Sequence, residues 1–321
     1  MIKKEYIYSR LSSNSIESLL NHHYNLEEIS SCIFYILGLH DNYLIKCKNN
    51  QYMLRVYRND WRTNEEVDFE LELLNYLQAK KQAVSYPIKT KDQTLSFEVS
   101  YPEGNRSMAL FSYADGKALS QEISLQESRI LGQSVANIHK TSNNFKTNKK
   151  RKSLNLTHLL YDSLLLIKPY ITPDELSFLK SISNIIASKI STLNRDTADY
   201  GICLGDVNSS NFHITPNNRI TLFDFDQCGY GYRTFELGKY LSSQHFHSSK
   251  EDIMEAFIQG YETVRTLTNE ERETIPYFEI ASVIWVMSIR VANKQKVGQA
   301  YLEKDYWKQR IGIVKSLVDN I

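Results

Sequence analysis

Residues 200–231, YGICLGDVNSSNFHITPNNRITLFDFDQCGYG, carry the clearest structural pattern in the chain. An apolar run at 202–204 leads into a polar loop, and an alternating segment follows that loop. The turn residues 216–218 then separate this segment from a second apolar run at 220–223. Such a pattern is typical of two short strands joined by a tight turn. We therefore predict a β-hairpin with polar loops at its ends.

Polar side chains stand at the ends of these predicted strands. Asp206 opens the polar loop, Asn211 follows five residues later, and Asp224 and Asp226 come after the second strand. In phosphoryl transfer one carboxylate orients the acceptor hydroxyl, while an Asn and a second Asp hold Mg²⁺, a hard cation that prefers oxygen ligands. The kinase catalytic loop has the spacing D-x-x-x-x-N, with a metal-binding Asp on the strand that follows. The same order and spacing here indicate phosphoryl transfer, and the alternative is a solvated hairpin with acidic ends.

This stretch resembles the aminoglycoside phosphotransferase superfamily, which includes type II homoserine kinases and usually reads H-G-D-x-x-x-x-N followed by D-x-D. The resemblance implies that Asp206 is catalytic, that Asn211 and Asp224 bind the metal, and that Asp226 supports them. Leu204 stands where the family has His. We expect this change to affect the support of the loop more than its chemistry, although it leaves a weakened enzyme or a pseudokinase open.

The resemblance covers roughly residues 15–300 and implies an α+β, bilobal, protein-kinase-like fold. Residues 1–115 would form an N-terminal nucleotide-binding lobe with N-terminal helices and a small antiparallel sheet. Residues 116–321 would form a mostly helical C-terminal lobe with the catalytic loop and the acceptor pocket. Within the first lobe, we predict helical segments over 13–36 and three strands over 34–57, where the apolar period changes to two.

The nucleotide site is predicted from the family's first lobe. Arg55 lies on the third predicted strand, where family members place a cation that reaches the phosphates; an ordinary strand Arg on the solvent face is the alternative. The following segment matches the family's V-x-x-E-L-x-x-L helix, which implies that Glu70 pairs with this cation. Phe111, Ser112 and Tyr113 resemble the hinge strand, whose backbone groups would contact the purine edge. Recognition through the backbone leaves ATP and GTP both open.

The predicted second lobe contributes further candidates. Glu236 replaces the family's Asp at a helix start, where the helix dipole favours a carboxylate that can brace the catalytic loop. Residues 143–153, NNFKTNKKRKS, form the one strong basic cluster; we predict a flexible loop, with contact to an anionic partner as the alternative. The family's last helices wall the acceptor pocket, and the candidates for that wall are Trp285, Arg290, Tyr301 and Trp307.

Composition excludes several classes of protein. The net charge is +1, from 38 basic and 37 acidic residues, so no global field points to nucleic acid or a membrane surface. The four Cys show no C-x-x-C spacing and are predicted to be free thiols. No apolar run suits a bilayer span and the N-terminus lacks a signal-peptide core, so we expect a cytoplasmic protein.

Together these features predict a phosphotransferase that moves the γ-phosphate of ATP, or of GTP, to a hydroxyl group of a small molecule with Mg²⁺. The acceptor stays open among homoserine-like amino alcohols, choline-like compounds, aminoglycosides and other antibiotics. A kinase acting on a protein or peptide and a nucleotide-binding pseudokinase are the alternatives. A plain scaffold has no use for the Asp, Asn and Asp in register, and the oligomeric state is not predicted.

Overall fold

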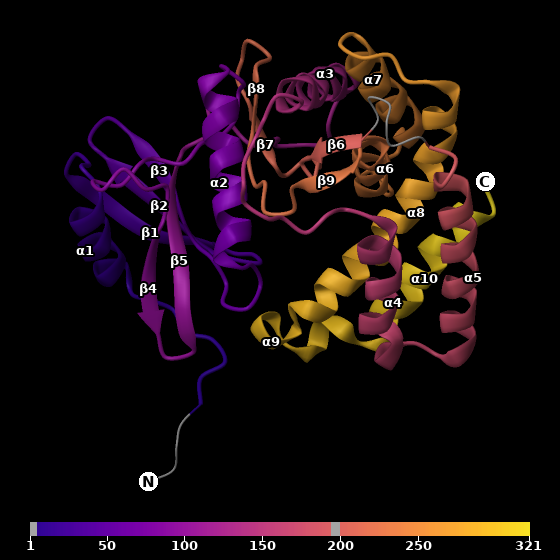
Figure 1. Cartoon of the computed structure of the whole chain (residues 1–321), viewed down its shortest axis with the longest axis horizontal. Helices are drawn as coiled ribbons and strands as arrows, with labels where there is room; N and C mark the ends of the chain where they lie inside the picture. The colour runs from indigo at the N-terminus through magenta and orange to yellow at the C-terminus, as the bar shows by residue number, and fades with distance from the viewer. Residues whose placement is uncertain (1–4, 194–199) are drawn as a thin grey trace. The chain divides into compact units, whose positions relative to one another are not determined.

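The computed structural model describes residues 5–193 and 200–321. The chain divides into two compact units, whose elements are labelled in Figure 1. Unit 1 comprises the residues up to Asp115 together with two later segments, 145–151 and 221–223, and unit 2 comprises the rest. Unit 1 is built on an antiparallel sheet and unit 2 is mostly helical, which confirms the predicted α+β class.

The sheet of unit 1 has five antiparallel strands in the order β1-β2-β3-β5-β4. The helix α1 (Ser13–His23) packs Ile16 and Leu20 into the apolar core that also contains the buried residues of β2 and β3. The strands are β1 (Ile29–Leu37), β2 (Asp41–Cys47), β3 (Gln51–Val56), β4 (Phe97–Tyr101) and β5 (Gly104–Ser112).

The strand β1 begins inside the region for which we predict helices. The helix α1 ends at His23, and the chain is extended from Ile29 onward, where Cys32 pairs with Ile45 of β2. The sequence ISSCIFYIL is rich in β-branched and aromatic residues, which suit a half-buried pleated surface once a partner strand is present. The second helical segment predicted before residue 36 is therefore wrong.

The helix α2 (Asn64–Ala79) begins with a capping box between Thr63 and Glu66 and carries the basic segment of the chain on its surface. The ring of Phe145 lies 5.7 Å from that of Phe69, and Lys149 Nζ lies 2.7 Å from a carboxylate oxygen of Asp68. The prediction of a flexible loop is thus wrong for 145–151, because this segment finds both an apolar and an acidic partner on α2.

Unit 2 is organised around α8, a helix of 24 residues that is long and apolar enough to cross a membrane by length and composition. By these two criteria alone, the expectation that no apolar run suits a bilayer span is wrong. Of the apolar window of α8, 67% is buried inside the fold, as in the core helix of a water-soluble protein. The helices of unit 2 are α3 (Leu125–Ser142), α4 (Asp162–Ile167), α5 (Pro173–Ile190), α6 (Thr234–Ser243), α7 (Lys250–Glu262), α8 (Asn269–Ala292), α9 (Lys294–Val297) and α10 (Lys304–Val318).

Short strands frame the polar loops of the stretch 200–231. β7 (Phe212–Ile214) and β8 (Ile220–Leu222) form the predicted two-stranded sheet. β6 (Tyr200–Cys203) pairs with β9 (Gly229–Tyr232), a strand that the sequence analysis does not predict. This second pairing joins the beginning and the end of the stretch, so that the loops after β6 and before β9 leave the same two-stranded sheet.

Candidate active site

The loop that follows β6 approaches the loop that precedes β9 very closely. Gly205 has a φ of +85°, and a Cβ atom at this position would lie only 2.1 Å from the carbonyl oxygen of Gln227. Only glycine accepts both this backbone conformation and this approach. The geometry therefore places the backbone beside Asp206 against the segment that carries Asp226.

The carboxylate of Asp206 is oriented by two donors. Its Oδ1 lies 2.8 Å from the ammonium nitrogen of Lys239, and its Oδ2 accepts a hydrogen bond of 3.1 Å from Asn211 Nδ2. The same amide group donates to the Asp206 carbonyl oxygen at 2.9 Å. The Asp206 side chain keeps 33% of its surface exposed, so a fixed carboxylate remains accessible to a substrate.

The buried carboxylate of Glu236, in the first turn of α6, holds the backbone of this loop. It accepts the N–H groups of Leu204 and Gly205, the latter at 2.8 Å. Burial raises the pKa of Glu236 to about 7, against the lowering effect of these two hydrogen bonds and of Lys239. This is the contact that the sequence analysis expects of a carboxylate at the start of α6.

His139 at the end of α3 lies behind this carboxylate. Its Nε2 is 3.5 Å from Glu236, and its Nδ1 is 2.9 Å from the hydroxyl of Tyr261. Burial, and then the nearby Arg233 and Arg265, lower the pKa of His139 well below its usual value. A neutral buried imidazole at this helix end can serve as a hydrogen-bonding partner of Tyr261 and Glu236.

Asp224 and Asp226 differ sharply in their surroundings. Asp224 is exposed and has a φ of +62°, a backbone conformation that is uncommon outside glycine and clusters at functional sites. Asp226 is buried and accepts a hydrogen bond of 3.0 Å from Gln227 Nε2. Of the two, Asp224 has the exposure that a metal-binding carboxylate needs.

The donor set fits Mg²⁺ bound together with a nucleotide. The Asn211 amide nitrogen faces Asp206, so its oxygen is the atom that could meet a cation, and Asp224 adds a carboxylate. Among the described residues no three His, Cys, Asp or Glu side chains form a closed metal cluster. Mg²⁺ commonly takes only one or two protein oxygen ligands, with phosphate and water completing its shell.

In unit 1 Arg55 and Glu70 form a buried ion pair. Arg55 Nη1 lies 2.9 Å from Glu70 Oε1, and the Glu70 side chain is fully buried. The hydroxyl of Tyr57 donates to Glu70 Oε2 at 3.1 Å, and the Arg55 guanidinium lies 5.2 Å from the centre of the Phe111 ring. The alternative of an ordinary Arg on the solvent face is wrong, because Arg55 is only 8% exposed.

The predicted hinge strand uses part of its backbone within unit 1. The N–H of Ser112 donates to the Tyr86 carbonyl oxygen at 2.9 Å, and the N–H of Tyr113 donates to that of Gln51 at 3.3 Å. Phe111 is buried and belongs to β5. A purine contact at Phe111, Ser112 and Tyr113 would therefore have to use other backbone groups than these two N–H donors.

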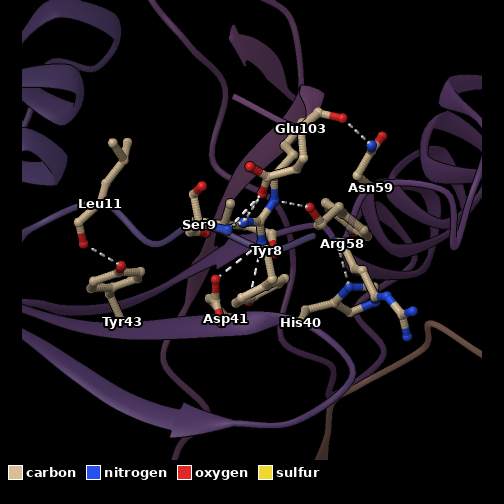
Figure 2. Close-up of polar contacts among 12 residues, drawn as sticks. Tyr8, Ser9, Leu11, His40, Asp41, Tyr43, Arg58, Asn59 and Glu103 are labelled. Atoms are coloured by element: carbon tan, nitrogen blue, oxygen red, sulfur yellow. Dashed lines mark hydrogen bonds and ion pairs between the residues drawn. The ribbon is translucent and has the colours of Figure 1, made fainter. Parts of the chain in front are cut away.

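A buried arginine that no motif predicts fixes the beginning of β2. Arg106 Nη2 lies 3.0 Å from Asp41 Oδ2, and Arg106 Nη1 donates to the carbonyl oxygen of Ser9 at 2.8 Å. Figure 2 shows Asp41 and Ser9 converging there, and beside them the imidazole of His40, whose Nδ1 accepts the N–H of Arg58 at 3.1 Å. The buried side chains of His40 and Asp41 thus point into unit 1.

The proposed wall of the acceptor pocket is largely wrong. Trp285 and Trp307 are 1% and 4% exposed and belong to the apolar core of unit 2, where the largest apolar side chains are most effective. Arg290 is half-buried, with its guanidinium 5.7 Å from the ring of Tyr306. The side chain of Tyr301 lies outside the described residues.

The sequence analysis does not predict the contact between Lys239 and Asp206. Lys239 lies three residues after Glu236 on α6, a spacing that puts two side chains on one face of a helix. That spacing was the available signal, because a lysine on the same face as the bracing carboxylate must also lie near the loop. The partner itself, Asp206, could not be identified, since it comes from another element.

Comparisons with known proteins identify the family of the chain. The model of the phosphotransferase enzyme family matches residues 37–273. The uncharacterized protein sll1119 of Synechocystis sp. is 33% identical over 313 residues, which cover 97% of this chain and 87% of that protein.

Two solved structures are similar over nearly the whole chain. A microcompartment-associated aminopropanol kinase has a TM-score of 0.79 at 20% identity and covers 95% of each chain. The amicoumacin kinase hAmiN, solved with AMP-PNP, Ca²⁺ and Ami, has a TM-score of 0.79 at 19% identity, over 97% of this chain and 94% of that one. These similarities confirm the protein-kinase-like fold. The chain belongs to the phosphotransferase enzyme family and is a phosphotransferase of the kinase type.

Proposed function

We propose that this protein transfers the γ-phosphate of ATP to a hydroxyl group of a small molecule in the presence of Mg²⁺. The observation that carries the proposal is the accessible carboxylate of Asp206, which Asn211 and Lys239 orient on a loop held by Glu236. A carboxylate fixed in this way suits the role of orienting an acceptor hydroxyl and accepting its proton.

In the proposed reaction the acceptor oxygen forms a bond to the γ-phosphorus, and the bond from that phosphorus to the β–γ bridging oxygen breaks. ADP leaves with the electron pair of that bond, and the acceptor proton passes to Asp206. Asn211 and Asp224 would hold Mg²⁺, which neutralises phosphate charge when bound. Arg55, held by Glu70, would engage the phosphates from unit 1.

The division of labour in this proposal follows the two predicted lobes, whose boundary at residue 115 lies at the first boundary between the two units. Residues 1–115 would bind the nucleotide, with Phe111, Ser112 and Tyr113 near the base, and residues 116–321 would supply the catalytic loop and the acceptor site. Asp226 and Glu236 would support that loop. GTP remains a possible donor, since backbone groups would contact the base.

The acceptor class is proposed from the named relatives. The similar proteins include kinases of aminopropanol and of amicoumacin, which are small molecules with hydroxyl groups, and the second was solved with the ATP analogue AMP-PNP. We therefore place small hydroxyl compounds before proteins or peptides as acceptors. Homoserine-like amino alcohols remain among the candidates, and a cytoplasmic enzyme that meets Mg-ATP fits this chemistry.

The test is ADP formation from Mg-ATP with a panel of acceptors: 1-amino-2-propanol, choline, homoserine, kanamycin and amicoumacin. We expect acceptor-dependent turnover that Asp206→Asn lowers by at least about 100-fold while nucleotide binding persists. The matched control is Asp252→Asn, an exposed carboxylate in the first turn of α7. Undiminished transfer in Asp206→Asn would refute the role of Asp206, and Mg-dependent nucleotide binding without any turnover would favour a pseudokinase.

A further inference from the structure

Lys239 presents an unusual feature in unit 2: a lysine whose side chain is only 6% exposed. Lysine is rarely buried without a charged partner, because removing an ammonium group from water is costly. Among the described residues the only carboxylate within ion-pair distance of Lys239 is that of Asp206, at 2.8 Å. Asp206 is therefore the direct partner that accounts for the buried ammonium group, and Glu236 is a second carboxylate close enough for Lys239 to lower its pKa.

The helix that carries Lys239 is rigidly seated. Gly238 faces α8 so closely that a Cβ atom at this position would lie 2.6 Å from the backbone nitrogen of Glu279. Phe235 and Tyr240, on the same helix, are fully buried. A side chain presented from such a helix is held more precisely than one on a surface loop.

Two neighbouring side chains of α6 hold different groups of the catalytic loop. Glu236 accepts backbone N–H groups of the loop, and Lys239, one turn later, holds the functional carboxylate. With Asn211 on Oδ2 and Lys239 on Oδ1, both oxygens of Asp206 have a fixed donor. Rotation of this carboxylate would break at least one of these contacts.

We propose that Lys239 is a positioning residue for phosphoryl transfer, whose ammonium group holds the Asp206 carboxylate in the orientation that receives the acceptor proton. This inference rests on the proposed function and assigns it a further residue. The ammonium group also keeps a positive charge beside the Asp206 carboxylate. In the proposed reaction this carboxylate would lie near the anionic phosphates. A displacement of about 1 Å in a catalytic group can lower a rate by about 100-fold.

Stability alone is a poor explanation for this pair. Replacing a buried ion pair by apolar residues of similar volume is often neutral or stabilising. Asp206 is also exposed enough to be solvated when its partner is removed. A lysine that served only the fold would show its effect in thermal stability, whereas a positioning residue shows it in kcat.

The experiment compares Lys239→Met, which keeps the aliphatic stem, with Lys239→Arg, which keeps the charge. The control is Lys250→Met, because Lys250 forms a partly buried ion pair with Glu279, at 2.7 Å, elsewhere in unit 2. For Lys239→Met we expect kcat to fall about 100-fold, with KM for Mg-ATP within about threefold of wild type and a melting temperature no lower than that of Lys250→Met. Lys239→Arg should recover at least about tenfold of the loss, and Lys250→Met should keep kcat.

The residual rate of a double variant distinguishes a positioning role of Lys239 from a merely structural one. In the Asp206→Asn background, Lys239→Met should lower the residual rate by less than about threefold, because a positioning residue acts through Asp206. The inference is overturned if Lys239→Met keeps wild-type kcat, or if its loss only parallels a loss of folded protein. If the wild-type enzyme shows no turnover on any acceptor, the proposed function is overturned and this inference with it. If the wild type turns over and Lys239→Met is equally active, the inference alone is overturned.

Discussion

The substitution Glu236→Gln removes the carboxylate that holds the backbone of the loop after β6. Glu236 is fully buried and accepts the N–H groups of Leu204 and Gly205. Burial disfavours its charged form and raises its pKa from 4.5 to about 7, although those hydrogen bonds oppose the shift. The protein therefore binds a proton at Glu236 more tightly when folded than when unfolded.

The magnitude follows from this difference in proton affinity. The difference between the unfolded pKa of 4.5 and the folded pKa of about 7 corresponds to about 3 kcal/mol between the two protonation states. Because the folded pKa is the higher one, the stabilisation from Glu236 is fully present below pH 4.5 and is lost as the pH rises to about 7. Glutamine does not titrate, so Glu236→Gln lacks this pH dependence.

The assay is urea unfolding of wild type and Glu236→Gln at intervals between pH 4.5 and 8. The free energy of unfolding of wild type relative to the variant should fall by about 3 kcal/mol over this range, mostly below pH 7. Glu255→Gln, an exposed position on α7, controls for the loss of one negative charge. A difference between wild type and Glu236→Gln that stays constant within about 1 kcal/mol would refute the reasoning.

Three further predictions concern contacts that the structure describes. Arg55→Met leaves the Glu70 carboxylate buried without its cation and should lower the free energy of unfolding, measured with urea, by about 3 kcal/mol. The double variant of Arg55→Met with Glu70→Gln should recover much of this lost stability. Gly205→Ala combines a positive φ with a clash against the Gln227 carbonyl and should cost about 2 kcal/mol or more in stability, together with a loss of kcat. Phe145→Ala removes the apolar anchor of the basic segment and should cost about 3 kcal/mol, with faster proteolysis in residues 146–152 as the local readout.

The features that could be predicted from the sequence are those encoded by short spacings. Asp206 and Asn211 stand five residues apart on one loop, and the hydrogen bond between them follows from that spacing. The Arg55–Glu70 pair joins adjacent elements, so a family pattern was enough to choose Glu70 among several acidic neighbours. Both cases depend on local geometry, which a strand or a helix fixes within a few residues.

The features that could not be predicted depend on which distant elements meet. Lys239 is separated from Asp206 by 33 residues, and the sequence does not tell that α6 lies against the loop. The basic segment is predicted to be a flexible loop, because nothing in it indicates the acidic and aromatic surface of α2 that receives Phe145 and Lys149. Trp285 was placed in a pocket for a similar reason: a large aromatic side chain suits a core and a binding wall equally well until its neighbours are known.

Leu204, which stands where the family has His, contacts the site through its backbone. Its side chain is buried, and the contact that it makes with Glu236 uses the backbone N–H, a group that almost every residue type supplies. The donors on the carboxylate of Asp206 come from Asn211 and Lys239. A leucine at this position therefore leaves the orientation of Asp206 intact. The argument for a pseudokinase from the missing His is weak on this geometry, because the described hydrogen bonds that orient the carboxylate come from other side chains.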